Sequence, residues 1–341
     1  MSNLPKIGID IGSSLIKAVE LNPRGRDWRL SSAISLASPV GGLIINNRES
    51  ITNVAQVLSR VVKEAGFKST RAVLSLPEDK VFTHLVNLPK MKDEEVEQTL
   101  QWQVEQYIPM PVDQTTWSYQ IIGKDGTESE GLEVLLIAAP KLLVETYKSV
   151  VDIVGLELLA IETELVAISR SIVPANSLLN VVLDLGSATT GIGVVNNGLL
   201  VFSRSIPTAG DAFNRAIASF LDLDIKQAEE YKNSYGFSAK YLDGKLIEAM
   251  KPVMGMIVEE IKKTIDYYTS KHTGQSPTSV IITGGVSVTP DIISQMSIAL
   301  GMEVILGDAF NKIKLDDSQH KALAGTFNIY SVATGLALRE I

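Results

Sequence analysis

The chain contains no cysteine, and only three of its 341 residues are histidine. Without cysteine, neither a disulfide framework nor a thiolate metal site can form. The histidines, His84, His272 and His320, lie far apart in the sequence. A metal centre built from several histidine ligands is therefore not expected. The lack of cysteine also permits a reducing compartment.

Long apolar runs and an excess of basic residues are missing as well. No uninterrupted apolar stretch approaches the roughly 18 residues that a membrane-spanning helix needs, and the amino-terminal segment lacks the apolar core of a signal peptide. Lys and Arg total 31 against 39 Asp and Glu, a net charge of −8. Because a nucleic-acid surface needs basic groups to replace counterions, we expect no nucleic-acid partner. These absences favour a cytoplasmic protein, and the 45% of hydrophobic residues is ample for real cores.

One short pattern occurs twice in the chain. Residues 7–14, IGIDIGSS, return as residues 181–188, VVLDLGSA. In each copy an apolar strand ends in Asp and is followed by a Gly-Ser turn and a second apolar strand. Two such hairpins predict an α/β protein with two related lobes, one opening near residue 7 and the other near residue 181.

The region between the hairpins shows a different pattern of apolar residues. Apolar periodicity predicts helices over residues 50–65 and 92–107, and alternating or β-branched runs predict strands around them. We interpret residues 39–139 as an inserted α+β domain. The first lobe then takes residues 1–38 with 140–180, and the second lobe takes residues 181–207 with 274–341. Residues 208–273 form a helical subdomain of the second lobe.

The first hairpin carries groups suited to a phosphate chain with a metal ion. Gly12 permits close backbone approach, Ser13 and Ser14 offer N–H and hydroxyl donors, and Lys17 can reach the same charge. Asp10 ends an apolar strand, a costly place for a carboxylate unless it meets a cation or donors. A hydrated Mg²⁺ suits it, because this ion keeps several waters and binds one or two carboxylates beside phosphates.

The second hairpin repeats this equipment, and its corresponding residues are Asp184, Gly186, Ser187, Thr189 and Thr190. Two facing hairpins would form a phosphate clamp, with Asp10 and Asp184 as the metal ligands. A lone Asp-x-Gly turn is ordinary hairpin chemistry, so the second copy is what favours a nucleotide site. A further strand, residues 280–283, ends in Gly284 and Gly285, which leave room for a base or phosphate tail; taken alone, this is a tight turn.

The order of these motifs resembles the five-motif signature of the actin, Hsp70 and sugar-kinase superfamily. That resemblance implies an actin-like, ribonuclease H-like bilobed fold hinged around a cleft for ATP and Mg²⁺. It implies that Glu229 and Lys232, in the Ala-Glu-x-x-Lys pattern of residues 228–232, approach the ribose and adenine. It places Glu164 where some members orient a water molecule. An amphipathic helix face explains Glu229 and Lys232 almost as well.

Within that superfamily, residues 101–111, QWQVEQYIPMP, resemble the insertion domain of the PilM family, the FtsA-like proteins of type IV pilus assembly. This implies that a short cytoplasmic peptide of a PilN-like inner-membrane protein binds in a groove beside the insertion domain. The protein would then be peripheral at the inner membrane. Contacts with pilus motor ATPases and self-association are left open. The chain departs from the family pattern at Gln103, Ala209 and Val286, where Glu, Gly and a third Gly are usual.

Three functions remain in view. The leading hypothesis is a nucleotide-dependent scaffold in which ATP closes the lobes and so presents the groove; whether ATP is hydrolysed slowly or not at all stays open. An FtsA-like division protein would carry an amphipathic membrane helix after the closing helix, and the sequence stops there at Ile341. A small-molecule kinase needs an acidic base beside a substrate hydroxyl, and no extra acidic motif stands out for it.

Overall fold

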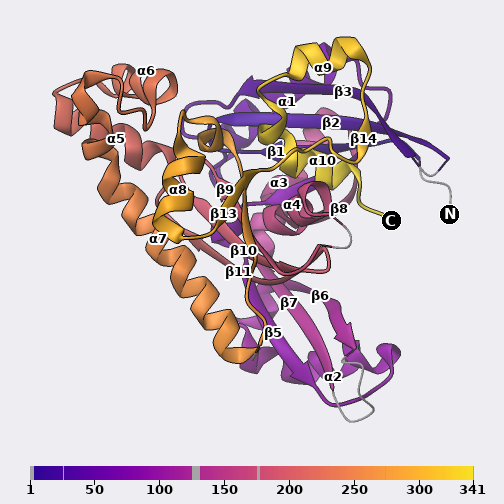
Figure 1. The fold of residues 1–341 in the computed structure, drawn as a ribbon. Coiled ribbons are helices and arrows are strands. Elements are labelled where there is room, and N and C mark those ends of the chain that lie inside the picture. Colours follow the sequence, from indigo (N-terminus) through magenta and orange to yellow (C-terminus); the bar gives the residue numbers. More distant parts are fainter. Residues whose placement is uncertain (1–3, 26, 125–130, 175–176, 273, 341) are drawn as a thin grey trace.

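The computed structural model describes residues 4–25, 27–124, 131–174, 177–272 and 274–340. Figure 1 shows two sheet-containing lobes and a smaller domain that projects away from the end where α9 (Asp317–Leu323) lies. None of the helices in these described ranges is long and apolar enough to cross a membrane.

The first lobe is built on a six-stranded sheet with strand order β14-β3-β2-β1-β4-β8. The first three strands along the chain form an antiparallel meander, whereas β4 and β8 are parallel to β1. Helices cover both faces: α1 and α3 pack on one, and α10 packs on the other, with α4 beside it. The elements are β1 (Lys6–Ile11), β2 (Leu15–Arg24), β3 (Asp27–Ala37), α1 (Arg48–Ala65), β4 (Arg71–Leu76), α3 (Lys141–Val154), β8 (Glu157–Thr163), α4 (Glu164–Ile172), β14 (Ile313–Lys314) and α10 (Ser331–Ala337).

The second lobe has a five-stranded sheet with strand order β11-β10-β9-β12-β13. Its largest core lies between this sheet and the helices that follow β11, so it unites the predicted lobe and the predicted helical subdomain. The elements are β9 (Asn180–Leu185), β10 (Thr190–Asn196), β11 (Leu199–Ile206), α5 (Gly210–Leu221), α6 (Ile225–Tyr235), α7 (Lys245–Lys271), β12 (Ser279–Thr283), α8 (Ile292–Leu300) and β13 (Glu303–Leu306).

The projecting domain is a three-stranded antiparallel sheet with order β5-β7-β6, covered on one face by α2. Alternation along the central strand explains its two faces. Val134, Leu136 and Ala138 point into the core with α2, whereas Leu135 and Ile137 pack towards α4 and the second lobe. The elements are β5 (Phe82–Leu88), α2 (Asp93–Tyr107), β6 (Thr115–Lys124) and β7 (Leu132–Pro140).

The lobe boundaries differ from those inferred from the sequence. Residues 39–139 were assigned to the insertion, but β4 lies between β1 and β8 in the first sheet, and α1 packs on the same sheet. The inserted domain therefore begins after Leu76. Likewise β14 and α10, which the sequence division placed in the second lobe, belong to the first, since β14 pairs with β3 and α10 packs on β1. These contacts are long-range pairings that local periodicity does not encode.

α4 and α10 cross each other between the two sheets, in a core that holds residues of both lobes. A Cβ atom built on Gly335 of α10 would lie 1.8 Å from the carbonyl oxygen of Ala167 in α4. On the other side of α10, a Cβ on Gly8 of β1 would lie 1.9 Å from the carbonyl oxygen of Ala333. Both positions require glycine because backbone meets backbone there. The crossing thus joins the first sheet, α10 and α4 with no side chain between them.

Replacing Gly335 by Ala should therefore lower the free energy of unfolding by about 1–3 kcal/mol or more, because the new methyl group forces the two helices apart. Gly255 is the matched control, since it is exposed in the middle of α7 with no atom within 4 Å of its Cβ position. Gly255→Ala should stabilise by about 0.5–1 kcal/mol. Urea denaturation of both variants measures the difference, and equal effects would contradict the tight crossing.

Candidate functional site

The two repeated hairpins adopt the same turn. The N–H of Gly12 donates to the carbonyl of Leu15 at 3.1 Å, and the N–H of Gly186 donates to that of Thr189 at 3.1 Å. At either glycine a Cβ would lie 2.9 Å from that carbonyl oxygen, which explains why glycine follows Asp-x in both copies. The repetition predicted from the sequence is therefore a repetition of backbone geometry.

The tips of the two turns touch each other. The hydroxyl oxygens of Ser13 and Ser187, which are 174 residues apart, lie 2.7 Å from one another and share a hydrogen bond. The hairpins open onto a single cavity of about 420 Å³ between the lobes. Its lining includes every residue that the sequence analysis named for the site except Thr190, namely Asp10, Gly12, Ser13, Ser14, Lys17, Glu164, Asp184, Gly186, Ser187, Thr189, Glu229, Lys232, Gly284 and Gly285.

Thr190 lies outside the lining. Its side chain is fully buried, and its hydroxyl donates to the carbonyl of Thr208 at 2.6 Å. It begins β10, so alternation along the strand turns it away from the cavity while Thr189, in the turn, faces it. The hydroxyl stabilises the connection between β11 and α5.

Asp10 and Lys17 form an ion pair inside the cavity. They are register partners across the β1–β2 hairpin, and Lys17 Nζ lies 2.6 Å from Asp10 Oδ2. Burial alone would lower the pKa of Lys17, but the Asp10 carboxylate beside it holds that pKa above its ordinary value. Asp10 is only 2% exposed, and its second carboxylate oxygen, Oδ1, has no hydrogen-bond partner. A buried carboxylate oxygen left unpaired is costly, and a cation is a natural partner for it.

The second hairpin lacks such a lysine. The register partner of Asp184 is Gly191, which packs against the side chain of Leu165 in α4. Burial in the cleft raises the pKa of Asp184 to about 6; Lys17 opposes this shift and the charge of Asp10 adds to it. The duplicated hairpins are therefore electrostatically unequal: one carboxylate is neutralised by the protein, and the other is left to an outside charge.

The turn after β12 closes the cleft from the second lobe. Gly284 has a φ of +87°, and a Cβ there would lie 2.4 Å from the carbonyl oxygen of Leu185 and 2.6 Å from Asp184 Oδ1. Its carbonyl is held by the side chains of Ser287 and Asn328, each at 2.7 Å. This explains the Thr-Gly-Gly signal of the sequence: the chain passes directly beside the carboxylate.

The start of α5 supplies residues that the sequence analysis did not name. The N–H groups of Gly210 and Asp211 donate to the carbonyls of Gly186 and Ser187 at 3.1 and 2.8 Å, so α5 begins on the second hairpin. Asp211 and Asn214 thereby line the cavity, and the side-chain oxygen of Asn214 is buried without a partner. The one signal that pointed here was the pair Ala209-Gly210, where the family has two glycines.

At the far wall, α6 contributes Glu229 and Lys232. Lys232 is 5% exposed, and burial lowers its pKa, while Glu229 and Asp211 act in the opposite direction. Val286, which stands where a third Gly is usual in the family, narrows the cavity between these elements: its Cγ2 would lie 2.9 Å from a Cβ on Gly210. This wall of the cavity thus presents Lys232 and the acids Glu229 and Asp211 beside the apolar side chain of Val286.

Glu164 enters the cavity from the first turn of α4. Burial raises its pKa well above the ordinary value, and the charges of Asp10 and Asp184 act in the same direction. Its Oε2 accepts the backbone N–H of Glu78 at 3.0 Å. The acid is therefore held in place from outside the cavity.

These donors fit Mg²⁺ bound together with phosphates better than a metal held by protein alone. Among the described residues, no cluster of three or more acidic, histidine or cysteine side chains could enclose a metal ion. Mg²⁺ commonly uses one or two carboxylates and takes its other ligands from water and phosphate. The unpaired oxygen of Asp10 and the uncompensated Asp184 meet that requirement.

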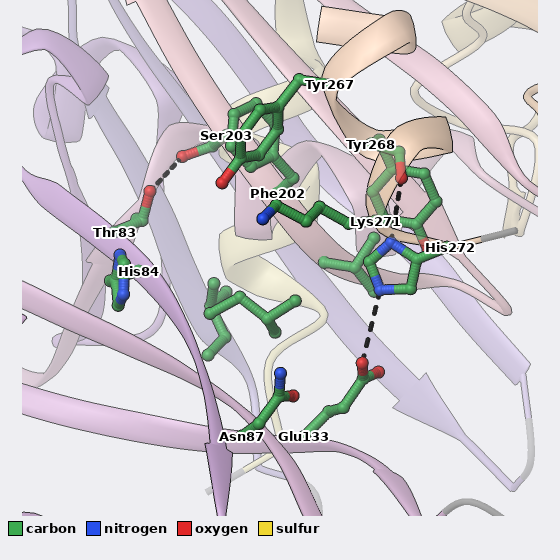
Figure 2. A pocket seen from close by; sticks show the side chains of 13 residues that line it. Thr83, His84, Asn87, Glu133, Phe202, Ser203, Tyr267, Tyr268, Lys271 and His272 are labelled. Atoms are coloured by element: carbon green, nitrogen blue, oxygen red, sulfur yellow. Dashed lines mark hydrogen bonds and ion pairs between the residues drawn. The ribbon is translucent and has the colours of Figure 1, made fainter.

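Two further hollows flank the projecting domain. A groove of about 650 Å³ separates β6 from the first lobe and the carboxyl-terminal segment. On the opposite side, a cavity of about 320 Å³ lies between β5, β11 and the end of α7. Figure 2 shows Lys271 pointing into it. The rings of Tyr268 and His272, which line this cavity, are stacked with their centroids 4.1 Å apart.

Comparison with known proteins settles the relationship. The family model described as type IV pilus assembly protein PilM matches residues 8–341. The chain belongs to this family. A solved structure, the PilM-PilN type IV pilus biogenesis complex, superposes with a TM-score of 0.85 at 23% identity and covers 99% of both chains. The predicted membership in the PilM family is confirmed.

More distant similarities agree on the fold. Ethanolamine utilization protein EutJ from Carboxydothermus hydrogenoformans has a TM-score of 0.59 at 18% identity, over 98% of this chain and 89% of that one. MreB5 of Spiroplasma citri bound to ADP has a TM-score of 0.52 at 14% identity, over 97% and 94%. EutJ of Escherichia coli strain K12 is 26% identical over 33% of this chain, and the match spans about a third of that relative's own length, 35%. The predicted actin-like bilobed fold is confirmed.

The unequal hairpins lead to a prediction for this PilM-family chain. A carboxyl whose pKa is raised in the folded state costs stability as the pH rises above its unfolded-state pKa, and the cost is complete once the pH exceeds the folded-state pKa. Stability of the ligand-free protein should therefore fall between about pH 4 and pH 6 on account of Asp184. Asp184→Asn, a neutral isostere, should raise the free energy of unfolding at pH 8 by about 1–2 kcal/mol, less than the full shift implies because the cleft is partly solvated.

Urea denaturation at pH 5 and pH 8 checks this. The gain from Asp184→Asn should be larger at pH 8, where the wild-type carboxyl is charged. A variant that is less stable than wild type at both pH values would contradict the electrostatic account of the second hairpin.

Proposed function

We propose that this PilM-family chain is a nucleotide-dependent scaffold of type IV pilus assembly, which binds Mg-ATP between its lobes and a cytoplasmic peptide of a PilN-like inner-membrane protein beside its insertion domain. The observation that carries the first part is the contact between Ser13 and Ser187 at the mouth of one cavity. A phosphate chain there would touch both lobes at once. Such a ligand has differential affinity for the closed arrangement, the condition for driving closure.

In this proposal the side chains take the following parts. The turns of the two hairpins receive the phosphates through backbone N–H groups and the hydroxyls of Ser13, Ser14, Ser187 and Thr189. Asp10 and Asp184 hold the hydrated Mg²⁺, which neutralises phosphate charge when bound. Lys17 is then free to turn from Asp10 to a phosphate oxygen. Glu229 and Lys232 lie where the ribose and adenine would end, and Glu164 is the acid placed to orient a water molecule if ATP is hydrolysed.

The groove of about 650 Å³ beside β6 is the better site for the peptide. Its lining includes the apolar side chains of Ile137, Ile161 and Val166. Arg170 and Lys312 also line it; Arg170 is paired with Glu162, and Lys312 Nζ donates to the carbonyl oxygens of Arg170 and Val173. Burial, with the charge of Arg170, lowers the pKa of Lys312. A peptide with apolar side chains and acidic or carbonyl acceptors would match this lining.

β6 also forms an outer edge of its sheet, so its backbone can pair with an extended peptide. Bound in this way, the protein would lie in the cytoplasm at the inner membrane, held by its partner.

The cleft assignment predicts a ligand-dependent rise in stability. At a hundredfold excess over Kd, Mg-ATP should stabilise the wild-type chain by about 2.7 kcal/mol, readable as a thermal shift. Asp10→Ala and Asp184→Ala should each reduce this shift strongly, because each removes a metal ligand. Asp27→Ala, at an exposed ion pair with Lys314, is the control and should keep the full shift. The assignment fails if both cleft variants respond to Mg-ATP as wild type does.

The groove assignment is tested by charge reversal on either side of the insertion domain. Lys312→Glu should weaken binding of a synthetic peptide from the cytoplasmic amino terminus of the PilN-like protein about tenfold, because it places a like charge against an acidic ligand. Lys271→Glu alters the cavity of Figure 2 instead and should leave the affinity unchanged. Fluorescence anisotropy gives both constants. The reverse pattern would move the peptide to the cavity of Figure 2.

A further inference from the structure

Glu78 is a buried acid that has no part in the function proposed so far. It follows β4 of the first lobe and precedes β5, the first strand of the insertion domain, and only 6% of it is exposed. Its carboxylate Oε2 accepts the N–H of Leu165 at 3.4 Å, and its own N–H donates to the carboxylate of Glu164 at 3.0 Å. The two glutamates are thus joined by two hydrogen bonds. Glu164 accepts the N–H of Glu78, and Glu78 accepts the N–H of Leu165, the residue that follows Glu164.

One end of this pair reaches the nucleotide cavity, because Glu164 lines it. Any charge that enters the cleft acts on the Glu164 carboxylate, and a shift of that carboxylate is passed to the backbone N–H of Glu78. The carboxylate of Glu78 caps the amino terminus of α4, where an acid is favourable. The segment that carries Glu78 is therefore pinned to the start of α4, the helix that crosses between the lobes.

The other end reaches the insertion domain. The hydroxyls of Ser203, on β11, and of Thr163 lie at the Glu78 carboxyl and partly offset the rise in its pKa that burial causes. The Ser203 hydroxyl in turn lies 2.7 Å from that of Thr83 on β5, as Figure 2 shows. One carboxyl group therefore stands where the first lobe, the second lobe and the insertion domain meet. Its other oxygen, Oε1, is buried without a hydrogen-bond partner, so the contact set is incomplete in this arrangement.

A second polar contact joins the insertion domain to the second lobe, between Glu133 Oε1 of β7 and His272 Nε2 after α7, at 3.3 Å (Figure 2). Of these two polar contacts, the one at Thr83 is continuous with the cleft through Ser203, Glu78 and Glu164. The order of contacts defines a physical path of short steps.

We infer that Glu78 is a positioning residue that couples occupancy of the nucleotide cleft to the placement of β5, and thereby of the insertion domain and its peptide groove. The inference rests on the proposed function, since it names the regulation of that site. Nucleotide and peptide binding are then linked by a coupling free energy that acts equally in both directions, typically 5- to 150-fold in affinity.

The test compares wild type with Glu78→Gln, an isostere that removes the negative charge and one of the two acceptor oxygens without opening a cavity. The matched control is Glu20→Gln: Glu20 is likewise a buried acid whose carboxylate accepts backbone N–H groups and a hydroxyl, but it does not line the cleft. Hydrogen–deuterium exchange of the amides of residues 82–88 is measured with and without Mg-ATP, and Mg-ATP affinity is measured by calorimetry.

In wild type and Glu20→Gln, Mg-ATP should change exchange in β5 by about fivefold or more, the size of a coupling of about 1 kcal/mol. In Glu78→Gln this response should be lost while the Mg-ATP affinity stays within about twofold. An unchanged β5 response in Glu78→Gln, or none in a wild-type protein that binds Mg-ATP, overturns the inference alone. Failure of wild type to bind Mg-ATP refutes the proposed function first.

A role confined to helix capping would lower the stability of Glu78→Gln and leave the nucleotide response of β5 intact, so the two roles are separable. If Glu78→Gln does not fold, Thr83→Val replaces it. This variant removes the hydroxyl that meets Ser203 and keeps the branched shape of the side chain. It should reduce the β5 response to Mg-ATP, and a full response would overturn the inference.

Discussion

The contact between α4 and α10 is the constraint on which the arrangement of this molecule depends. Because Gly335 has no side chain, α10 lies against the backbone of Ala167, while Gly8 lets the same helix lie against β1. The first sheet, α10, α4 and the second sheet are consequently stacked with little freedom to slide. This stacking brings two hairpins that are 174 residues apart in sequence within one hydrogen bond of each other, at Ser13 and Ser187.

The cleft that results is rich in acid. Asp10, Glu164, Asp184, Asp211 and Glu229 line it, against the two lysines Lys17 and Lys232. Burial raises the pKa of Glu164 and Asp184 because nearby carboxylates and the loss of water both disfavour their charged forms. These carboxylates would repel an anionic ligand unless a cation accompanied it. These charges support the metal–nucleotide complex that we propose as the ligand of the cleft.

The sequence predicted the fold and most of the cleft because both are written in local motifs. An apolar strand that ends in Asp and turns through Gly-Ser is visible without a structure, and its second copy indicated two lobes. Thr-Gly-Gly at residues 283–285 was equally visible. Glycine is needed there because the backbone of Gly284 passes directly beside Asp184.

What the sequence could not predict depends on pairing between distant segments. Asp211 and Asn214 enter the cleft because the start of α5 bonds to the second hairpin, and no periodicity reports that contact. The boundary of the insertion domain moved because β4 pairs in parallel between β1 and β8. Nothing in the local sequence singles out Glu78; only the fold shows it buried between two lobes and a domain.

The long helix α7 extends from the neighbourhood of the cleft to the insertion domain. Its 27 residues extend about 40 Å, and Figure 1 shows it running from α5 and α6, beside the cleft, down to the level of β5. Its end meets the insertion domain through His272 and Glu133. Over that length, a tilt of about 5° at the cleft displaces the far end by about 3.5 Å. Such a displacement would equal roughly the spacing between neighbouring residues in a strand.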